Sequence, residues 1–224
     1  MARRKILSKA DLDRITEATR QAESKTSGEI LTVIANRSGS YTGRVIVVGL
    51  VGLVIFSLAY LTFLPAAGHF LRRFFWDFQA RHALWTLLVG QAAVFLIIYG
   101  LFSLIPGLKS LIISRRDKDD KVRHRAESSF FRHHITSTKG GTGVLVFISL
   151  FERRVELLVD AAIAGEIPKQ TWQGVVRGIV AGIKNKRFVD DLCAQVIHVG
   201  EILSKDFPRR AGDVNELPDR PVVE

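Results

Sequence analysis

Two apolar stretches decide how this chain is organised: VIVVGLVGLVIFSLAYLTFL, residues 45–64, and ALWTLLVGQAAVFLIIYGLFSLI, residues 83–105. They are 20 and 23 residues long, and neither contains a charged residue. Because an α-helix rises about 1.5 Å per residue, roughly 20 residues cross the hydrocarbon core of a bilayer. The two stretches therefore predict a transmembrane hairpin of two helices. Polar groups are costly in lipid, and Ser and Thr usually bond their own backbone, so Gln91 is the one polar residue there that is a candidate for a contact with the other helix.

The distribution of basic residues predicts the orientation of this hairpin. The segment that joins the two stretches carries three Lys or Arg residues, whereas seven follow within 20 residues of the second stretch. Cytoplasmic flanks of membrane helices accumulate Lys and Arg. We therefore expect a plasma (inner) membrane protein with two spans and both termini in the cytoplasm. The 20 residues before the first span carry only three basic residues, so the second flank decides the orientation.

The same basic residues account for the charge of the whole chain. A formal net charge of +10 is compatible with an anionic partner such as nucleic acid or lipid headgroups. Their concentration beside the second span gives a simpler explanation. The expected partners are the lipid bilayer and other membrane proteins, and no nucleic-acid partner is expected.

The polar sequence on either side of the hairpin predicts a soluble α/β domain in two parts. Residues 1–43 form the first part, with an amphipathic helix in LSKADLDRITEATRQAE and a strand in EILTVIAN. Residues 44–106 contain the hairpin. Residues 107–207 form the second part, and residues 208–224 read as an irregular tail. In the second part we expect a helix in DKVRHRAESSFFRHHI, strands in GVLVFISL and RVELLVDAAI, and helices from Pro168 and from about Phe188.

One helix and one strand cannot bury a core by themselves, so the first part must pair with the second. A strand followed by a crossover and a returning strand predicts a mixed sheet with helices on its faces. The fold class is therefore α/β, a mixed-sheet sandwich interrupted by a transmembrane hairpin.

Several segments of these two parts resemble the TPM domain family, the group of the thylakoid lumen and photosystem-repair proteins and their bacterial relatives. They are TSGEILTVIA (26–35), FFRHHITSTKGGTGVLVFISLFERRVELLVDAAIAGEIP (130–168), Trp172, the pair Phe207 and Pro208, and NELPD (215–219). The resemblance implies a compact α/β sandwich. It also implies phosphatase activity in some members, divalent-metal binding in some, and roles in assembling or repairing membrane complexes.

This chain departs from the usual layout of that family. A hairpin interrupts the domain, and MARRKI stands where an acidic stretch often precedes the first helix. We therefore expect a membrane-anchored TPM-like module that is not catalytic and engages, or helps to assemble and maintain, membrane protein complexes. The alternative is a metal-dependent phosphatase, that is, a phosphomonoester hydrolase.

If the chain is an enzyme, its candidate residues lie at the ends of the predicted strands. Asp160 ends VELLVD, where a carboxylate is suited to catalysis or to binding Ca²⁺ or Mg²⁺, although capping a turn is the simpler role. Glu152 and Glu29 are further candidate metal ligands, and Glu29 reaches Asp160 only if their strands are neighbours. Arg153 and Arg154 are candidate phosphate-binding residues, because guanidinium groups bind phosphate through two hydrogen bonds. Charged hairpin tips also occur simply because they face water.

Overall fold

A computed structural model describes residues 7–74, 80–105, 108 and 111–224. The chain divides into two compact units, one made of Met1–Gly39 with Arg116–Glu224 and the other of Ser40–Arg115. The described residues form seven α-helices and a mixed sheet of four strands. The coarse prediction of a mixed α/β fold is therefore confirmed.

The first unit is built around the sheet. Its elements are α1 (Lys9–Glu23), β1 (Glu29–Ala35), α5 (Arg115–Arg132), a 3-10 turn (Ile135–Ser137), β2 (Gly143–Ser149), β3 (Arg154–Val159), α6 (Ala161–Glu166), α7 (Lys169–Lys184), α8 (Phe188–Asp206) and β4 (Val222–Val223). The strand order is β3-β2-β1-β4. β1 is parallel to β2 and to β4, whereas β2 and β3 are antiparallel.

The strand that precedes the hairpin in sequence lies inside this sheet. β1 pairs with β2 from Glu29 opposite Gly143 to Ala35 opposite Ser149. Both strands are buried along their whole length, as their continuous apolar sequences predict for central strands. The expected pairing of the first strand with strands beyond the hairpin is confirmed.

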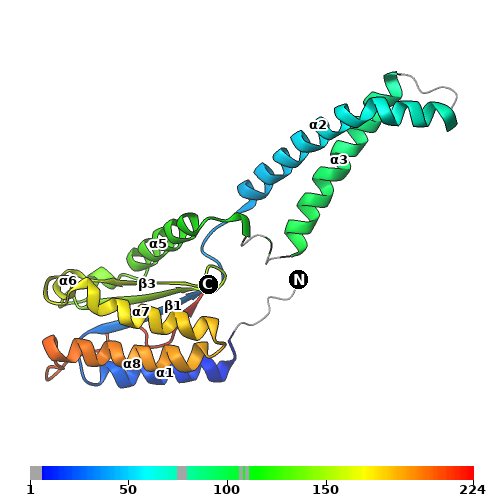
Figure 1. Ribbon diagram of the computed structural model, residues 1–224. Helices are drawn as coiled ribbons and strands as arrows, with labels where there is room; N and C mark the ends of the chain where they lie inside the picture. The colour runs from blue at the N-terminus through cyan, green and yellow to red at the C-terminus, as the bar shows by residue number, and fades with distance from the viewer. Residues whose placement is uncertain (1–6, 75–79, 106–107, 109–110) are drawn as a thin grey trace. The chain divides into compact units, whose positions relative to one another are not determined.

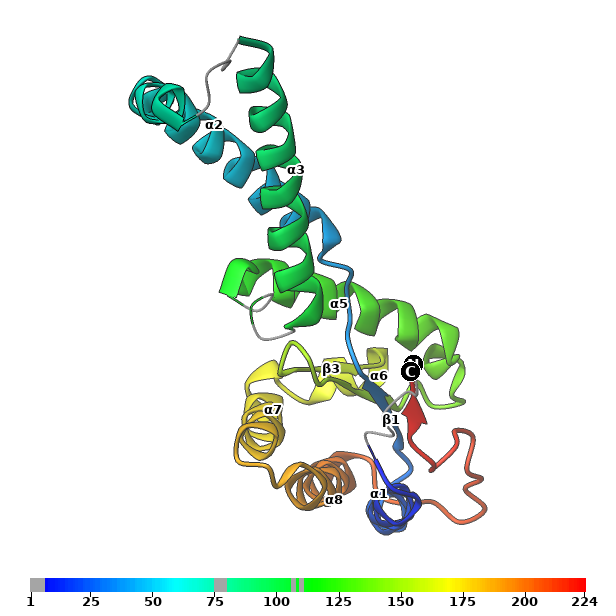
Figure 2. The same ribbon diagram turned by 90° about the vertical axis from the view of Figure 1, so that its right-hand side faces the viewer.

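Helices cover both faces of the sheet, which gives a three-layer sandwich (Figures 1 and 2). α1, α7 and α8 lie on one face, where Ile30, Val146 and Trp172 belong to the larger apolar core. α5 lies on the other face, and its Val122, Ala126 and Phe130 pack with Leu31, Val33 and Phe147. This alternation follows from the period of two along a strand, which sends successive side chains to opposite faces.

Two helix boundaries have identifiable local causes. α1 begins after Ser8, whose hydroxyl accepts the Asp11 N–H at 3.1 Å while the Asp11 carboxylate accepts the Ser8 N–H at 2.9 Å. This is a capping box, and it satisfies two backbone donors that a helix start otherwise leaves open. α5 ends at Arg132 because His134 adopts the left-handed conformation, with φ at 54°.

The C-terminal residues differ from the irregular tail predicted from the sequence. Pro208 forms an antiparallel bridge with Thr26, and β4 pairs with Val33 and Ile34 of β1. The Glu224 N–H donates to the Ile34 carbonyl at 3.0 Å. The tail thereby pairs the outer edge of β1, which would otherwise leave strand N–H and C=O groups open. The sequence did not predict this strand, because it is only two residues long and lies in a tail rich in proline and charged residues.

The second unit contains α2 (Thr42–Phe74) and α3 (Ala80–Leu104), which pack side by side (Figure 1). The segments Thr42–Phe63 and Leu84–Leu104 have mean hydropathies of 2.6 and 2.2, and both are long and apolar enough to cross a membrane. α2 continues past Pro65 to Phe74, beyond the predicted end of the first span at residue 64.

Small and polar residues join these two helices. A Cβ added at Gly90 would lie 2.4 Å from the tip of the Phe56 ring, so any larger residue would force the ring to shift; the glycine allows Phe56 to pack directly against α3. The Gln91 amide donates to the Ser57 hydroxyl at 2.8 Å, and the Tyr60 and Thr86 hydroxyls lie 2.6 Å apart. The structure therefore contains the contact between helices for which Gln91 was a candidate.

Candidate functional site

Asp160 lies where β3 passes into α6. Its N–H donates to the Gly143 carbonyl at 2.9 Å, which continues the β2–β3 pairing by one residue. Its Oδ1 accepts the Ala161 N–H at 2.7 Å and so caps α6. Its Oδ2 is buried and has no hydrogen-bond partner among the residues that the structure describes. One carboxylate oxygen therefore has a structural role, and the other is uncommitted.

Glu152 lies in the turn between β2 and β3, at the opposite end of the sheet. Its side chain is almost fully buried, with the residue only 3% exposed, and accepts the Ser38 N–H at 3.2 Å and the Ser149 hydroxyl. Ser38 and Ser149 also share a hydrogen bond of 2.7 Å. This network fixes the chain where it leaves β1, so Glu152 serves as an anchor for that loop.

The two arginines beside Glu152 differ from one another. Arg153 is exposed and occupies the left-handed region, with φ at 52°. Arg154 begins β3 and forms an ion pair with Asp119 of α5. One of the two candidate phosphate-binding guanidinium groups is therefore already paired with a carboxylate.

Glu29 begins β1 at the same end of the sheet as Asp160. β2 lies between their strands, with Glu29 and Asp160 flanking Gly143 from its two sides. Glu29 is 7% exposed and accepts the Leu217 N–H at 3.1 Å. Burial raises the pKa of the Glu29 carboxyl, an effect opposed by hydrogen bonds from the Leu217 and Glu216 backbone.

The structure does not bring the three candidate metal ligands together. The seven residues of β2, at about 3.3 Å each, place Glu152 roughly 20 Å from the end that holds Glu29 and Asp160. Across the described ranges, no group of three or more His, Cys, Asp or Glu side chains is arranged to hold a metal ion. The donor set present does not fit the divalent cation that the TPM resemblance implies.

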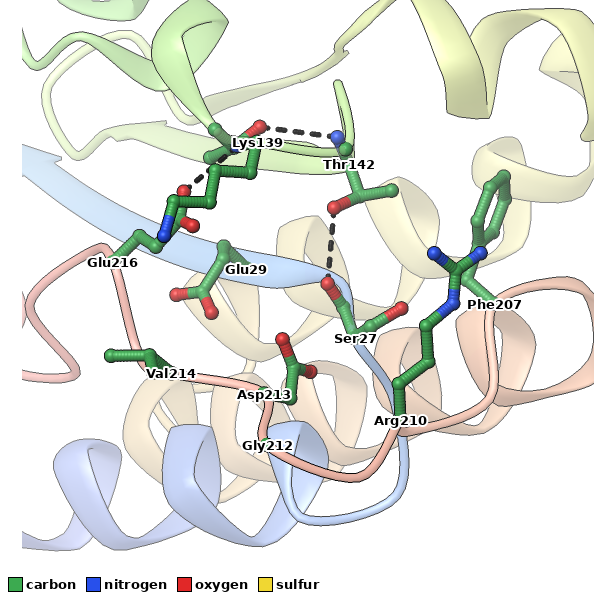
Figure 3. A pocket seen from close by; sticks show the side chains of 12 residues that line it. Ser27, Glu29, Lys139, Thr142, Phe207, Arg210, Gly212, Asp213, Val214 and Glu216 are labelled. Carbon is green, nitrogen blue, oxygen red and sulfur yellow. Dashed lines mark hydrogen bonds between the residues drawn. The ribbon is translucent and has the colours of Figure 1, made fainter.

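A pocket of about 260 Å³ opens beside Glu29 (Figure 3). We call it the Glu29 pocket; its walls come from the start of β1, the loop before β2, and the C-terminal tail. The Thr142 hydroxyl donates to the Ser27 carbonyl at 3.0 Å, and the Lys139 N–H donates to Glu216 at 2.9 Å. Its lining includes carboxylates and cationic side chains, namely Glu29, Asp213, Glu216, Lys139 and Arg210. Such a lining offers acceptors and donors to a small polar ligand.

A second hollow of about 210 Å³ shares Glu29, Asp213 and Val214 with this pocket and extends to Glu23 and Asp219. Glu23 accepts the Ile30 N–H at 2.8 Å. Burial raises the pKa of Glu23 to about 8, the Ile30 hydrogen bond opposes that rise, and the charges of Glu29 and Asp219 add to it.

Sequence reasoning did not single out Glu23, Asp213 or Asp219. Glu23 is the last residue of an amphipathic helix, and the two aspartates lie in a tail that reads as irregular. Their meeting depends on the tail returning to β1, which no local pattern encodes. The available signal was NELPD, which entered only through the family resemblance.

Comparisons with known proteins add evidence on the fold. No family model matches the chain, and no curated protein matches it. A structural match is the NMR structure of BA42 protein from the psychrophilic bacteria Bizionia argentinensis sp. nov., at 16% sequence identity. The alignment covers 100% of this chain and 99% of that chain, with a TM-score of 0.58. This likeness supports the mixed α/β fold alone.

Proposed function

We propose that the protein is a membrane-anchored, TPM-like binding module without catalytic activity, which engages other proteins of the plasma membrane. The hairpin is its anchor, with both termini in the cytoplasm. Apolar side chains on both helices of the hairpin are more than half exposed, among them Ile55, Leu58 and Leu96. Lipid would cover such surfaces favourably, at about 25 cal/mol per Å² of apolar area.

One observation carries the proposal that the module is not catalytic: Glu152 lies at the opposite end of the sheet from Glu29 and Asp160, and each of the three carboxylates accepts a backbone N–H of the fold. Glu152 anchors the loop after β1, Glu29 holds the Leu217 N–H, and Asp160 caps α6. Chemistry at a metal or phosphate needs several such groups within a few ångströms of one point. A binding module needs only a stable surface.

Hydrolysis of a generic phosphomonoester by the full chain in detergent tests this proposal. We expect product release no faster than the buffer blank, with or without Mg²⁺ or Ca²⁺. Release that depends on the cation and is lost in Asp160→Asn would overturn it.

The partners can be tested separately from catalysis. After mild detergent extraction of native membranes, the chain should migrate in an assembly larger than its monomer. A chain that migrates only as a monomer contradicts the proposed engagement of other membrane proteins.

The proposed orientation has its own test. A reporter fused after Glu224 that is active only outside the cytoplasm should remain silent.

A second candidate function is metal-dependent phosphomonoester hydrolysis with Asp160 as the catalytic residue. The observation in its favour is the buried Oδ2 of Asp160, which lacks a hydrogen-bond partner in the described part of the chain. Asp160→Asn would preserve the cap on α6 through its amide oxygen while removing the charge. Unchanged metal-stimulated activity in this variant would remove Asp160 from the site.

A further inference from the structure

The end of the first unit where β1 and β2 stop is also the end at which the chain leaves for the hairpin and returns from it. β1 stops at Ala35, and Asp119 in the first turns of α5 forms an ion pair with Arg154, which begins β3. A Cβ added at Gly39 would collide with the Lys121 side chain, so the outgoing chain lies against α5. Both connections to the hairpin therefore depart from one end of the sheet.

The loop between α7 and α8 lies at this same end. The C-terminus of α8 is held at the start of β1, because the Ser27 N–H donates to the Phe207 carbonyl at 3.1 Å. α8 is 19 residues long, about 28 Å, and so carries its first residue, Phe188, to the end where β1 stops. α7 finishes at Lys184, a short loop before Phe188, and therefore finishes there too.

α1 starts at this end as well, since its Arg14 forms an ion pair with Asp190 in the first turn of α8. Exposed cationic side chains thereby collect here from separate parts of the chain. They are Lys9 at the start of α1, Arg37 after β1, Arg116 in α5, Arg153 between β2 and β3, and Lys184 and Lys186 between α7 and α8. We call these six residues the cationic end.

Most carboxylates of this end are already engaged, whereas the six cations are not. Across the described ranges, no ion pair or side-chain hydrogen bond involves any of the six side chains. The engaged carboxylates are Asp119 with Arg154, Asp190 with Arg14, and Asp191 with Arg187. Asp13 and Asp120 are exposed carboxylates that offset part of the positive charge. The cationic end therefore keeps an excess of positive charge available to an anionic partner.

Orientation of the hairpin does not explain these cations. Lys and Arg set the orientation only within about 20 residues of a span. Arg153, Lys184 and Lys186 lie far beyond that distance from residue 104, where α3 ends. The fold, and not nearness in sequence, brings them to the end from which the hairpin departs.

Two of the six residues occupy backbone conformations that suit glycine better. Arg153 has φ at 52° and Lys186 has φ at 59°, both in the left-handed region. Glycine would adopt these turns without the steric cost of a Cβ. Long cationic side chains at both turns are therefore not required by the backbone, which points to a role for the charges themselves.

We propose that the cationic end binds the anionic headgroups of the bilayer, an inference that rests on the membrane anchoring proposed above. The hairpin tethers this end to the lipid, so the headgroup phosphates are the anions nearest to it. Each Lys or Arg close to an anionic membrane surface favours binding by about fivefold. The Glu29 pocket, at the opposite end of the sheet, then faces away from the lipid.

Lysine reactivity of the full chain in nanodiscs tests this inference. Discs of phosphatidylcholine alone are compared with discs that also contain phosphatidylglycerol, and each lysine is acetylated by an uncharged reagent. We expect Lys184 and Lys186 to react at least roughly threefold more slowly in the anionic discs at low salt. Lys139 and Lys169, exposed at the opposite end of the sheet, should react equally in both. The difference should vanish near ~1 M salt, where charges are screened beyond about 3 Å.

Equal reactivity of Lys184 and Lys186 in the two kinds of disc at low salt would overturn the inference while leaving the anchoring intact. A chain that enters neither kind of disc would contradict the proposed anchoring, and this inference with it. Lysines that react equally in both discs but become protected when RNA is added would assign the surface to nucleic acid, which also overturns the inference.

Charge reversal separates headgroup binding from other effects of anionic lipid. Hydrogen exchange at the Arg153 amide should be slower in anionic than in neutral discs. The double variant Lys184→Glu and Lys186→Glu should lose most of this protection, because each cation contributes about fivefold. The matched control, Lys139→Glu with Lys169→Glu, changes the net charge equally and should keep it. A Lys184→Glu and Lys186→Glu chain that remains as protected as the control contradicts the inference.

Discussion

The two ends of the sheet both contain buried carboxyl groups, but the groups have different surroundings. At the end where β2 meets β3, Glu152 is surrounded by donors, since Ser38 and Ser149 both donate to it. At the end where β1 begins, Glu23 and Glu29 lie near further carboxylates of the C-terminal tail, residues 208–224. A buried carboxylate with enough donors fixes a fold, whereas carboxyls that crowd each other make it sensitive to protonation.

Of these single substitutions, Glu152→Ala should cause the largest change in the free energy of unfolding. It leaves the Ser38 N–H and the Ser149 hydroxyl without their buried acceptor, which costs about 2–4 kcal/mol of unfolding free energy. Denaturant unfolding of the full chain in detergent measures the loss, with Glu166→Ala as the exposed control. A loss no greater than that of the control would mean that Glu152 does not anchor the loop after β1.

Glu23→Gln should act in the opposite direction, and only at higher pH. The unmodified chain loses stability as pH rises from the ordinary pKa of Glu23 toward about 8, because its folded form resists ionisation. The variant lacks this penalty, so near neutral pH it should be more stable by about 1–3 kcal/mol, and near pH ~4.5 the two should match. The pH dependence of the unfolding free energy checks this. A constant difference at all pH values would exclude titration of Glu23 as the cause.

The hairpin offers a comparison with a polar contact that involves no carboxyl group, because its Gln91 amide donates to the Ser57 hydroxyl. Gln91→Leu should destabilise the pairing of α2 and α3 by about 0.5–1.5 kcal/mol, the range for hydrogen bonds between membrane helices. Unfolding in mixed detergent micelles measures it. Thr62→Val is the matched control, since the hydrogen bonds of the Thr62 hydroxyl within the described part of the chain go to the Leu58 and Ala59 carbonyls of its own helix.

The smallest effect is expected at Arg153, beside the well-satisfied Glu152. Its φ of 52° favours glycine, so Arg153→Gly should leave the chain equally stable or raise its unfolding free energy by about 0.5 kcal/mol. Thermal unfolding checks the sign. A clear loss would show that the Arg153 side chain makes a stabilising contact.

Sequence patterns predicted those parts of the fold that depend on local periodicity. Apolar length predicted both hairpin helices, and continuous β-branched runs predicted β1 and β2. The pairing of β1 with β2 followed because an isolated strand leaves backbone groups open. α6 and β4 were not predicted, since a helix of six residues and a strand of two carry too little pattern.

The candidate site was harder to predict from the sequence than the fold, for a physical reason. Charge and strand-end position selected Asp160, Glu152 and Glu29, but the strand order decides which of these can meet. Glu29 and Asp160 share an end of the sheet with β2 between them, and Glu152 is at the other end. The Glu29 side chain instead contacts the C-terminal tail, whose return to β1 depends on tertiary contacts.

The central claim is that the first unit is one fold although the hairpin divides its sequence. Its direct test replaces residues 45–113 with a short Gly/Ser linker and compares this chain with a fragment that begins at Arg115. The linked chain should unfold cooperatively and with a higher midpoint and a steeper denaturant dependence, because it retains α1 and the central strand β1. If the fragment unfolds with the same midpoint and slope, α1 and β1 add nothing to the core, and the account of a divided single fold is wrong.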